Sequence, residues 1–285
     1  MQTRRTTWLL LAPALAFYAL FVLWPILQSI RFSLFVGSDA VGGHFARLLL
    51  RPDGRFFRAL GNNVLLVLLS LLIQLPCALG LALLLSGRLP GRGLLRTLYF
   101  APMIIPTVAI GFLWRFIYKP AAQGGVLNQL LAGVGLGTVD WLGDPGVDLF
   151  AIILTVSWRY IGFHTVLFLA GLQAIPGEVY EAARLDGATG WEAFRDITLP
   201  MMRRVIAVSA TLSLVGSLKY FDIFYVMSPG GGTRGSADLV TTYMYRTAFS
   251  AQNPGYGSAI AVALLVATLV VAVPVMRVLY GRRGR

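Results

Sequence analysis

Polar side chains recur at helical spacing inside apolar stretches of this chain. Ser209, Ser213 and Ser217, followed by Tyr220, fall on one face of a helix. Hydroxyl groups and an aromatic ring suit a sugar, which has hydroxylated edges and apolar faces. Small residues are also favoured where helices pack together in a membrane. The stripe therefore indicates either a path for a hydroxylated solute or a contact between helices.

A second polar and aromatic group comprises Trp158, Arg159, Tyr160, Phe163 and His164. Polar side chains inside a membrane span are costly and mark candidate substrate pathways. Arg159 is the strongest single candidate. The alternative is that its charged end reaches the outer interface, as arginine near helix ends can do.

Catalysis and metal binding have no comparable support. His44 and His164 are far apart, and neither has a carboxylate or a second histidine at ligand spacing. A phosphate-binding Walker loop needs Gly-Lys followed by Ser or Thr. Neither of the only two lysines, Lys119 and Lys219, follows a glycine. We therefore predict no catalytic residues, no metal site, no bound cofactor and no nucleotide site in this chain.

The composition indicates a membrane protein. Of the 285 residues, 57% are apolar and 13% are charged, whereas soluble chains carry roughly 25% charge. The apolar residues form blocks of the length that crosses a bilayer, about 20 residues. This excludes an ordinary soluble enzyme, a disordered chain and, with Cys77 alone, a disulfide-rich domain. We predict an all-α, multi-pass membrane protein with one domain over residues 1–285 and six spans, at about 8–33, 64–85, 98–117, 150–172, 205–224 and 258–280.

The basic residues predict the orientation. The first apolar block follows Arg4 and Arg5, as in a signal peptide, but it is longer than the roughly 7–15 residues of a signal core. We therefore predict a retained helix. With both termini in the cytoplasm, the inner segments carry thirteen arginines and the outer loops seven lysines or arginines. Membrane orientation, and not nucleic-acid binding, thus explains the net charge of +12. The first outer loop, with four arginines, can form a helix lying on the membrane.

The segment between the fourth and fifth spans has helix signals of its own. Pro176 can begin a helix, and Glu181 lies near the positive end of its dipole. Gly187 ends this helix. Thr189 and Glu192 then form the capping box of a second short helix. We predict a rigid pair of short helices at the inner face of the membrane.

This segment is acidic, which bears on what it contacts. It contains two basic residues and five carboxylates, those of Glu178, Glu181, Asp186, Glu192 and Asp196. Helices that rest on a lipid surface usually attract anionic lipid through Lys and Arg. We therefore predict a docked protein partner, with a lipid-surface helix as the alternative.

The same segment carries a family resemblance. Glu181-Ala182-Ala183, then Gly187, then Ile197-x-Leu199-Pro200 resembles the EAA loop of the permease subunits of binding-protein-dependent ABC importers. Ala-Ile-Pro before it and Asp-Gly-Ala within it are typical of the carbohydrate-uptake group, of maltose or glycerol-phosphate type. Similar strings at Phe221-Asp222-Ile223 and in residues 255–259 extend the resemblance to nearly the whole chain. Ser228-Pro229 departs from the pattern of that outer loop.

The resemblance implies how such a protein is driven. In this family the EAA loop sits in a cleft of a separate cytoplasmic ATPase, which binds ATP and magnesium. The coupling segment would be residues 175–200, and the coupling residues would be Glu181, Ala182, Ala183, Asp186, Gly187, Ile197, Leu199 and Pro200.

The resemblance and the polar stripes together imply a path for a sugar or polyol, made by Met103, Thr107, Arg159, Tyr160, Phe163, Ser213, Ser217 and Tyr220. The implied partners are a second homologous permease, two ATPase subunits and an extracytoplasmic solute-binding protein. The implied location is the cytoplasmic membrane of a bacterium or archaeon. The alternative function is a secondary transporter or channel that works without an ATPase.

Overall fold

The computed structural model describes residues 2–35, 41–50, 54–87 and 90–280, and all regular structure in these residues is helical. Within this part of the chain, five helices are long and apolar enough to cross a membrane: Thr7–Phe35, Gly54–Ser86, Asp148–Gln173, Gly190–Met227 and Pro254–Val275. A sixth span results if the bent pair Arg92–Ile104 and Thr107–Ile117 counts as one. The predicted all-α, multi-span class is therefore confirmed.

The helices form two compact units. The first comprises Met1–Phe57 and Val240–Ala267, and the second comprises Arg58–Leu239 and Thr268–Arg285. The prediction of one domain over residues 1–285 stays a prediction. Every candidate site residue predicted from the sequence lies in the second unit.

The first unit joins an amino-terminal helix to a carboxy-terminal one. Its elements are α1 (Gln2–Tyr18), a π turn (Ala19–Leu23), α2 (Trp24–Phe35), α3 (Gly43–Leu49), α14 (Val240–Tyr245), a second π turn (Arg246–Ser250) and the beginning of α15 (Pro254–Tyr280). The guanidinium of Arg47 on α3 lies 4.7 Å from the centre of the Tyr256 ring on α15. This cation–π contact fixes α3, which lies in the first predicted outer loop; its placement on the membrane stays a prediction.

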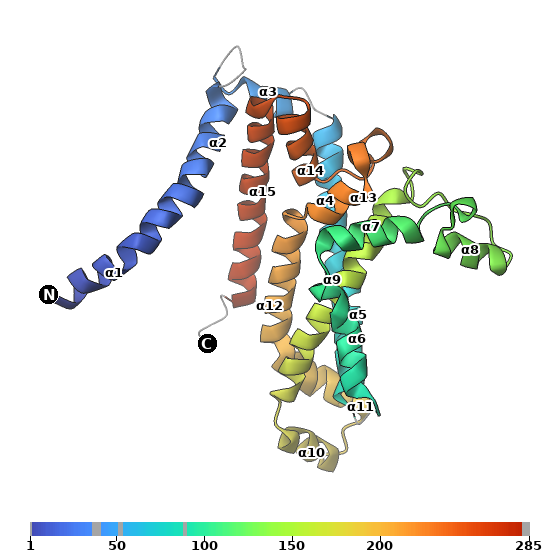
Figure 1. The fold of residues 1–285 in the computed structure, drawn as a ribbon. Coiled ribbons are helices and arrows are strands. Elements are labelled where there is room, and N and C mark those ends of the chain that lie inside the picture. The colour runs from blue at the N-terminus through green and yellow to red at the C-terminus, as the bar shows by residue number, and fades with distance from the viewer. Residues whose placement is uncertain (1, 36–40, 51–53, 88–89, 281–285) are drawn as a thin grey trace. The chain divides into compact units, whose positions relative to one another are not determined.

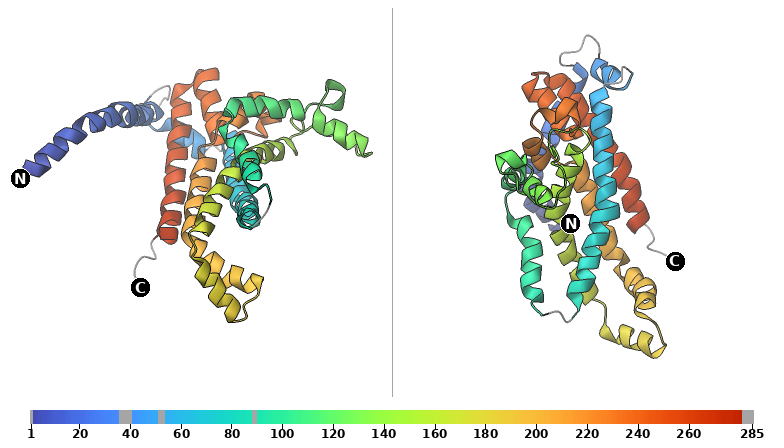
Figure 2. Two further views of the ribbon diagram at one scale, coloured as in Figure 1. Left: turned by 60° about the horizontal axis from the view of Figure 1, so that its bottom comes forward. Right: turned by 90° about the vertical axis from the view of Figure 1, so that its right-hand side faces the viewer.

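The second unit holds the remaining helices around α9. They are α4 (Gly54–Leu69), a π turn (Ser70–Gln74), α5 (Leu75–Ser86), α6 (Arg92–Ile104), α7 (Thr107–Ile117), α8 (Val126–Gly133), α9 (Asp148–Gln173), α10 (Gly177–Leu185), α11 (Gly190–Ala193), a π turn (Phe194–Thr198), α12 (Leu199–Leu218), α13 (Asp222–Met227) and the end of α15. Helix α9 packs against α5, α6 and α12. Helices α10 and α11 lie at one end of this unit and α13 at the other (Figure 1 and Figure 2).

Two buried apolar clusters hold α9 in place. One joins α9 to α7 and α13 through Ile152, Ile110 and Phe224. The other joins it to α12 through Phe168 and Met202. Because α9 takes part in both clusters, its two ends are fixed independently of each other.

The predicted third span is broken in the structure. Helices α6 and α7 meet at an angle of 102°. Pro106 is the cause, because a proline disfavours the helical conformation at the residue before it. Ile105 accordingly has φ −67° and ψ 135°, which is extended, and α6 ends at Ile104. The apolar pattern over 98–117 predicted the helical residues but not the bend between them.

Glycines on α9 allow its neighbours to approach closely. A Cβ atom built on Gly162 would lie 1.8 Å from the carbonyl oxygen of Tyr99 on α6. One built on Gly171 would lie 2.9 Å from the sulfur of Met202 on α12. Small residues permit such close approach between helices in a membrane.

Side chains close the helix ends within this unit. The Asn63 amide on α4 donates to the carbonyl oxygens of Ser217, at 3.0 Å, and Leu218, at 3.4 Å, where α12 ends. On α9, the Arg159 guanidinium donates to the carbonyl oxygen of Met103 at 3.4 Å, near the end of α6. A carbonyl out of reach of water needs such a donor.

We expect Gly162→Ala to destabilise the protein by about 1–3 kcal/mol, the usual cost of overpacking a close contact. The added methyl group would meet a backbone carbonyl of α6, so relief requires the two helices to separate. The thermal unfolding midpoint of the purified protein in detergent measures this effect.

Gly80→Ala on α5 is the matched control, since nothing lies within 4 Å of the Cβ atom it adds. Equal unfolding midpoints for the two variants would show that α6 and α9 do not approach closely at Gly162.

Candidate functional site

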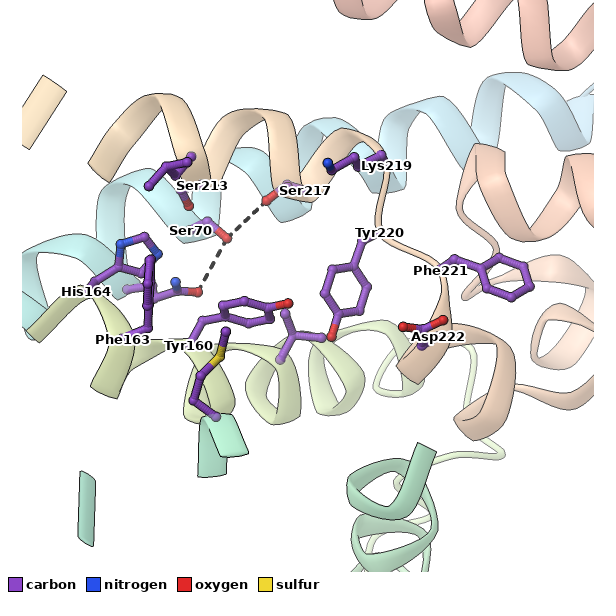
Figure 3. A pocket seen from close by; sticks show the side chains of 15 residues that line it. Ser70, Tyr160, Phe163, His164, Ser213, Ser217, Lys219, Tyr220, Phe221 and Asp222 are labelled. Atoms are coloured by element: carbon purple, nitrogen blue, oxygen red, sulfur yellow. Dashed lines mark hydrogen bonds between the residues drawn. The ribbon is translucent and has the colours of Figure 1, made fainter. Parts of the chain in front are cut away.

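A cavity of about 380 Å³ lies between α9 and α12. The π turn between α4 and α5 and the end of α6 complete its wall. Six of the eight predicted path residues line it: Met103, Tyr160, Phe163, Ser213, Ser217 and Tyr220. The structure thus brings together residues from three predicted spans around one space (Figure 3).

Aromatic rings form one side of the cavity. Tyr160 on α9 and Tyr220, just after α12, have ring centroids 6.0 Å apart and planes at 76°. Phe163 extends this side along α9, since residues three apart share a helix face. These rings offer apolar surface next to phenol hydroxyls.

Hydroxyl and amide groups form the other side. The Ser217 hydroxyl donates to Ser70 at 3.4 Å, and the Ser70 hydroxyl donates to Oε1 of Gln74 at 3.5 Å. Figure 3 shows this chain as dashed lines, with the rings of Tyr160 and Tyr220 across the cavity from Ser217. The cavity therefore combines an aromatic wall with a hydrogen-bonding wall.

Charged groups are few at this site. Lys219 and Asp222 are the charged residues of the lining, and they carry opposite charges. Both are exposed. His164, a buried lining residue, lies with Nδ1 2.6 Å from the hydroxyl of Ser209.

Two predicted path residues lie outside this lining. Thr107 begins α7 beyond the bend. Arg159 is 7% exposed, and its guanidinium carbon lies 5.6 Å from the centre of the Tyr160 ring. Among the described residues, its Nε and Nη1 atoms have no hydrogen-bond partner. Its contact with Met103 places this side chain at the end of α6, and not in the cavity.

Sequence reasoning missed the contribution of the second span. Ser70 and Gln74 line the cavity from the π turn. A signal was present, because both polar residues interrupt the apolar block 64–85 at a spacing of four. π turns inside helices are frequent at functional sites.

The candidate coupling loop lies at one end of the second unit. Helix α10 ends in a Schellman motif, in which the N–H of Gly187 donates to Arg184 O at 3.1 Å and that of Ala188 donates to Ala183 O at 2.9 Å. Gly187 has φ +81°, a conformation that other residues rarely adopt. The predicted helix stop at this glycine is therefore confirmed.

The predicted capping box is also present. The N–H of Thr189 donates to the Glu192 carboxylate at 2.7 Å, and the N–H of Glu192 donates to the Thr189 hydroxyl at 3.3 Å. It opens α11. A contact of 3.0 Å between the Tyr180 and Thr198 hydroxyls then ties α10 to the π turn after α11. The loop is thus held by its own hydrogen bonds.

The loop presents polar and apolar side chains outward. Glu181, Ala182, Asp186, Gly187 and Pro200 are exposed, Ile197 and Leu199 are half-buried, and Ala183 is buried. Leu185 and Trp191 are 89% and 66% exposed. Exposed large apolar residues beside carboxylates are a surface that fits a protein partner.

The loop and the cavity share their helices. Helix α9 lines the cavity through Tyr160 and Phe163 and continues toward the loop, ending at Gln173. Helix α12 begins at Leu199, where the loop ends, and lines the cavity through Ser213 and Ser217. A displacement of the loop therefore acts on both of these cavity walls.

The fold and the loop define a class of protein. The chain belongs to the family described as binding-protein-dependent transport system inner membrane component, whose family model matches residues 74–285. It is accordingly a permease subunit of an ABC importer, a transport component and not an enzyme. The family predicted from the EAA segment is confirmed.

Individual relatives cover nearly the whole chain. The probable ABC transporter permease protein YurN of Bacillus subtilis is 35% identical over 100% of this chain and 98% of its own length. The trehalose/maltose transport system permease protein MalF of Thermococcus litoralis is 33% identical over 98% of this chain and 94% of its own length.

A solved structure is similar as well. It is a bacterial alginate ABC transporter in complex with an alginate pentasaccharide-bound periplasmic protein. The matching chain has a TM-score of 0.86 and 26% identity, covering 100% of this chain and 98% of that chain.

We expect Gly187→Ala to loosen the end of α10. A side chain in the left-handed region costs roughly 1–2 kcal/mol, and the hydrogen bond from Ala188 to Ala183 depends on that conformation. Hydrogen exchange of the peptide spanning α10 and α11 should quicken about tenfold, since each 1.4 kcal/mol is a factor of ten.

Gly190→Ala is the control, because Gly190 has no positive φ and nothing within 4 Å of its added Cβ. Unchanged exchange in Gly187→Ala would contradict the role given to this glycine.

Proposed function

We propose that this chain forms half of the translocation path for a sugar or related polyol in an ATP-driven importer. One observation carries the proposal: the two helices that flank the EAA loop, α9 and α12, are the same helices that line the cavity. In an importer, motion driven by the ATPase at the loop must reach the cavity that holds the solute, and these shared helices provide that connection.

The cavity lining supports a saccharide. Tyr160, Phe163 and Tyr220 offer surfaces for the apolar face of a sugar ring, and Ser213 and Ser217 offer hydroxyls for its edge. Met103 closes the wall from α6. The names of two relatives, for trehalose/maltose and for alginate, point to the same chemical class.

The loop supports coupling to an ATPase. Exposed Glu181 would be the polar anchor in a cleft of the partner, and Ala182 would permit close approach. The exposed side chains of Leu185 and Trp191 add apolar surface to this contact. Closure of the ATPase pair would pull the loop and tilt α9 and α12. A coupling free energy would then link nucleotide binding at the ATPase to access at the cavity.

The proposed importer contains partner subunits for the functions that this chain does not perform. A second homologous permease completes the path, two ATPase subunits bind ATP and magnesium, and an extracytoplasmic binding protein delivers the solute. The complex of the alginate transporter with a periplasmic protein supports the last of these partners. This chain itself needs no cofactor. Both of its termini face the cytoplasm of a bacterium or archaeon, which puts the coupling loop on the ATPase side.

We expect Glu181→Lys to release the ATPase from the tagged chain during purification from native membranes. The reversed charge would occupy the position of the proposed anchor, while the second permease should remain bound. Quantitative mass spectrometry of the purified material measures both partners.

Glu178→Lys makes the same charge change on another exposed residue of the same helix, which is not one of the predicted coupling residues. ATPase retained by Glu178→Lys and lost by Glu181→Lys supports the proposal. Equal retention by both variants, or wild-type chain purified without any ATPase, contradicts it.

A further inference from the structure

We propose that Gln74 is a specificity-determining residue of the cavity, and that its side-chain amide donates a hydrogen bond to a hydroxyl of an uncharged sugar. This inference rests on the proposed function, because it assigns the solute contact within the same cavity. It comes from an element, the π turn of the second span, that carried no predicted path residue.

The π turn places Gln74 at the cavity wall. The turn covers Ser70–Gln74, between α4 and α5. Residues four apart in a helical segment lie on one face, and Ser70 and Gln74 both line the cavity. Gln74 is 3% exposed, and Ser70 is 2% exposed. A long polar side chain this deeply buried in an apolar span is costly unless it is used.

The hydrogen bonds leave one end of the Gln74 amide available. Ser217 donates to Ser70, and Ser70 donates to Oε1 of Gln74, so the carbonyl end of the amide already has a donor. No described residue accepts a hydrogen bond from Nε2, and this atom is not among the fully buried polar atoms without a partner, so it is accessible at the cavity wall that Gln74 lines. A solute oxygen is the missing acceptor.

The opposite wall fixes how a sugar would lie. Tyr160 and Tyr220 stand across the cavity from the serine chain (Figure 3). A ring resting its apolar face on these aromatics directs its equatorial hydroxyls sideways, toward polar groups. Ser213, which is 7% exposed, lines the same polar side and can meet a second hydroxyl.

The charges of the lining favour an uncharged solute. Lys219 and Asp222 offset each other in sign. Arg159, the buried cation nearest to Tyr160, is outside the lining and contacts Met103 O instead. An acidic sugar would bring an unbalanced charge into this space, whereas a neutral sugar would bring only hydroxyls.

The test uses the reconstituted importer, with its ATPase, second permease and binding protein in proteoliposomes. Uptake of maltose, trehalose and lactose is measured first, together with an anionic digalacturonate. The best neutral substrate is then compared with its monodeoxy analogues in wild type, Gln74→Met and Gln74→Glu. Both substitutions keep the length of the side chain and remove the N–H donors.

We expect each variant to lower uptake of the neutral sugar about tenfold, the effect of a lost hydrogen bond of the usual strength. One monodeoxy analogue should be transported poorly by wild type and no worse by the variants, because it lacks the hydroxyl that accepts from Gln74. A merely structural role would not single out one analogue. Ile73→Met, a change at an exposed residue of the same turn, should transport like wild type.

The outcomes separate this inference from the proposed function. Two results overturn only the role of Gln74, provided that wild type takes up a neutral sugar. In the first, both variants take it up at the wild-type rate. In the second, the variants lower uptake of the sugar and of every monodeoxy analogue by the same factor. If wild type takes up digalacturonate faster than the neutral sugars, the inference that the solute is uncharged is overturned. Absence of any ATP-dependent sugar uptake by wild type overturns the proposed function itself.

Discussion

A backbone carbonyl at a helix end needs a hydrogen-bond donor, and inside a membrane no water supplies it. This protein ends or breaks helices beside its cavity, so the requirement falls on side chains of neighbouring helices. Asn63 supplies it for the end of α12, and Arg159 supplies it for the end of α6. These two contacts hold the irregular backbone that surrounds the cavity. The Asn63 contact lies just before Tyr220 in the chain, and the Arg159 contact lies just before the bend that Pro106 causes.

Close contacts between helices and hydrogen bonds within the loop hold the second unit together. Close backbone contact at Gly162 joins α9 to α6, and contact at Gly171 joins α9 to α12. The coupling loop is closed by its own hydrogen bonds, through the Schellman motif at Gly187 and the capping box at Thr189. Under the proposed function, this loop would transmit displacement to the two helices that flank it. Under the proposed function, such displacement would change access to the cavity between those helices.

Short sequence motifs correctly predicted where individual helices begin and end. The helix stop at Gly187 and the capping box at Thr189 depend on neighbouring residues, and both are present. The apolar blocks predicted the helical class, and the polar groups of the predicted spans, together with the resemblance, predicted six of the fifteen residues that line the cavity. What the sequence could not specify arises between distant residues. The contact of Arg159 with Met103 joins α9 to α6, and the chain from Ser217 to Gln74 joins α12 to the second span. No periodicity within one segment contains this information.

The central claim is that the cavity between α9 and α12 holds the solute while the loop between those helices holds the ATPase. The most direct measurement is a cryo-EM map of the whole importer, trapped with its solute-loaded binding protein. The account predicts sugar density against Tyr160 and Tyr220, and an ATPase cleft occupied by α10. Sugar density confined to the second permease, or an ATPase that contacts another segment of this chain, would contradict it.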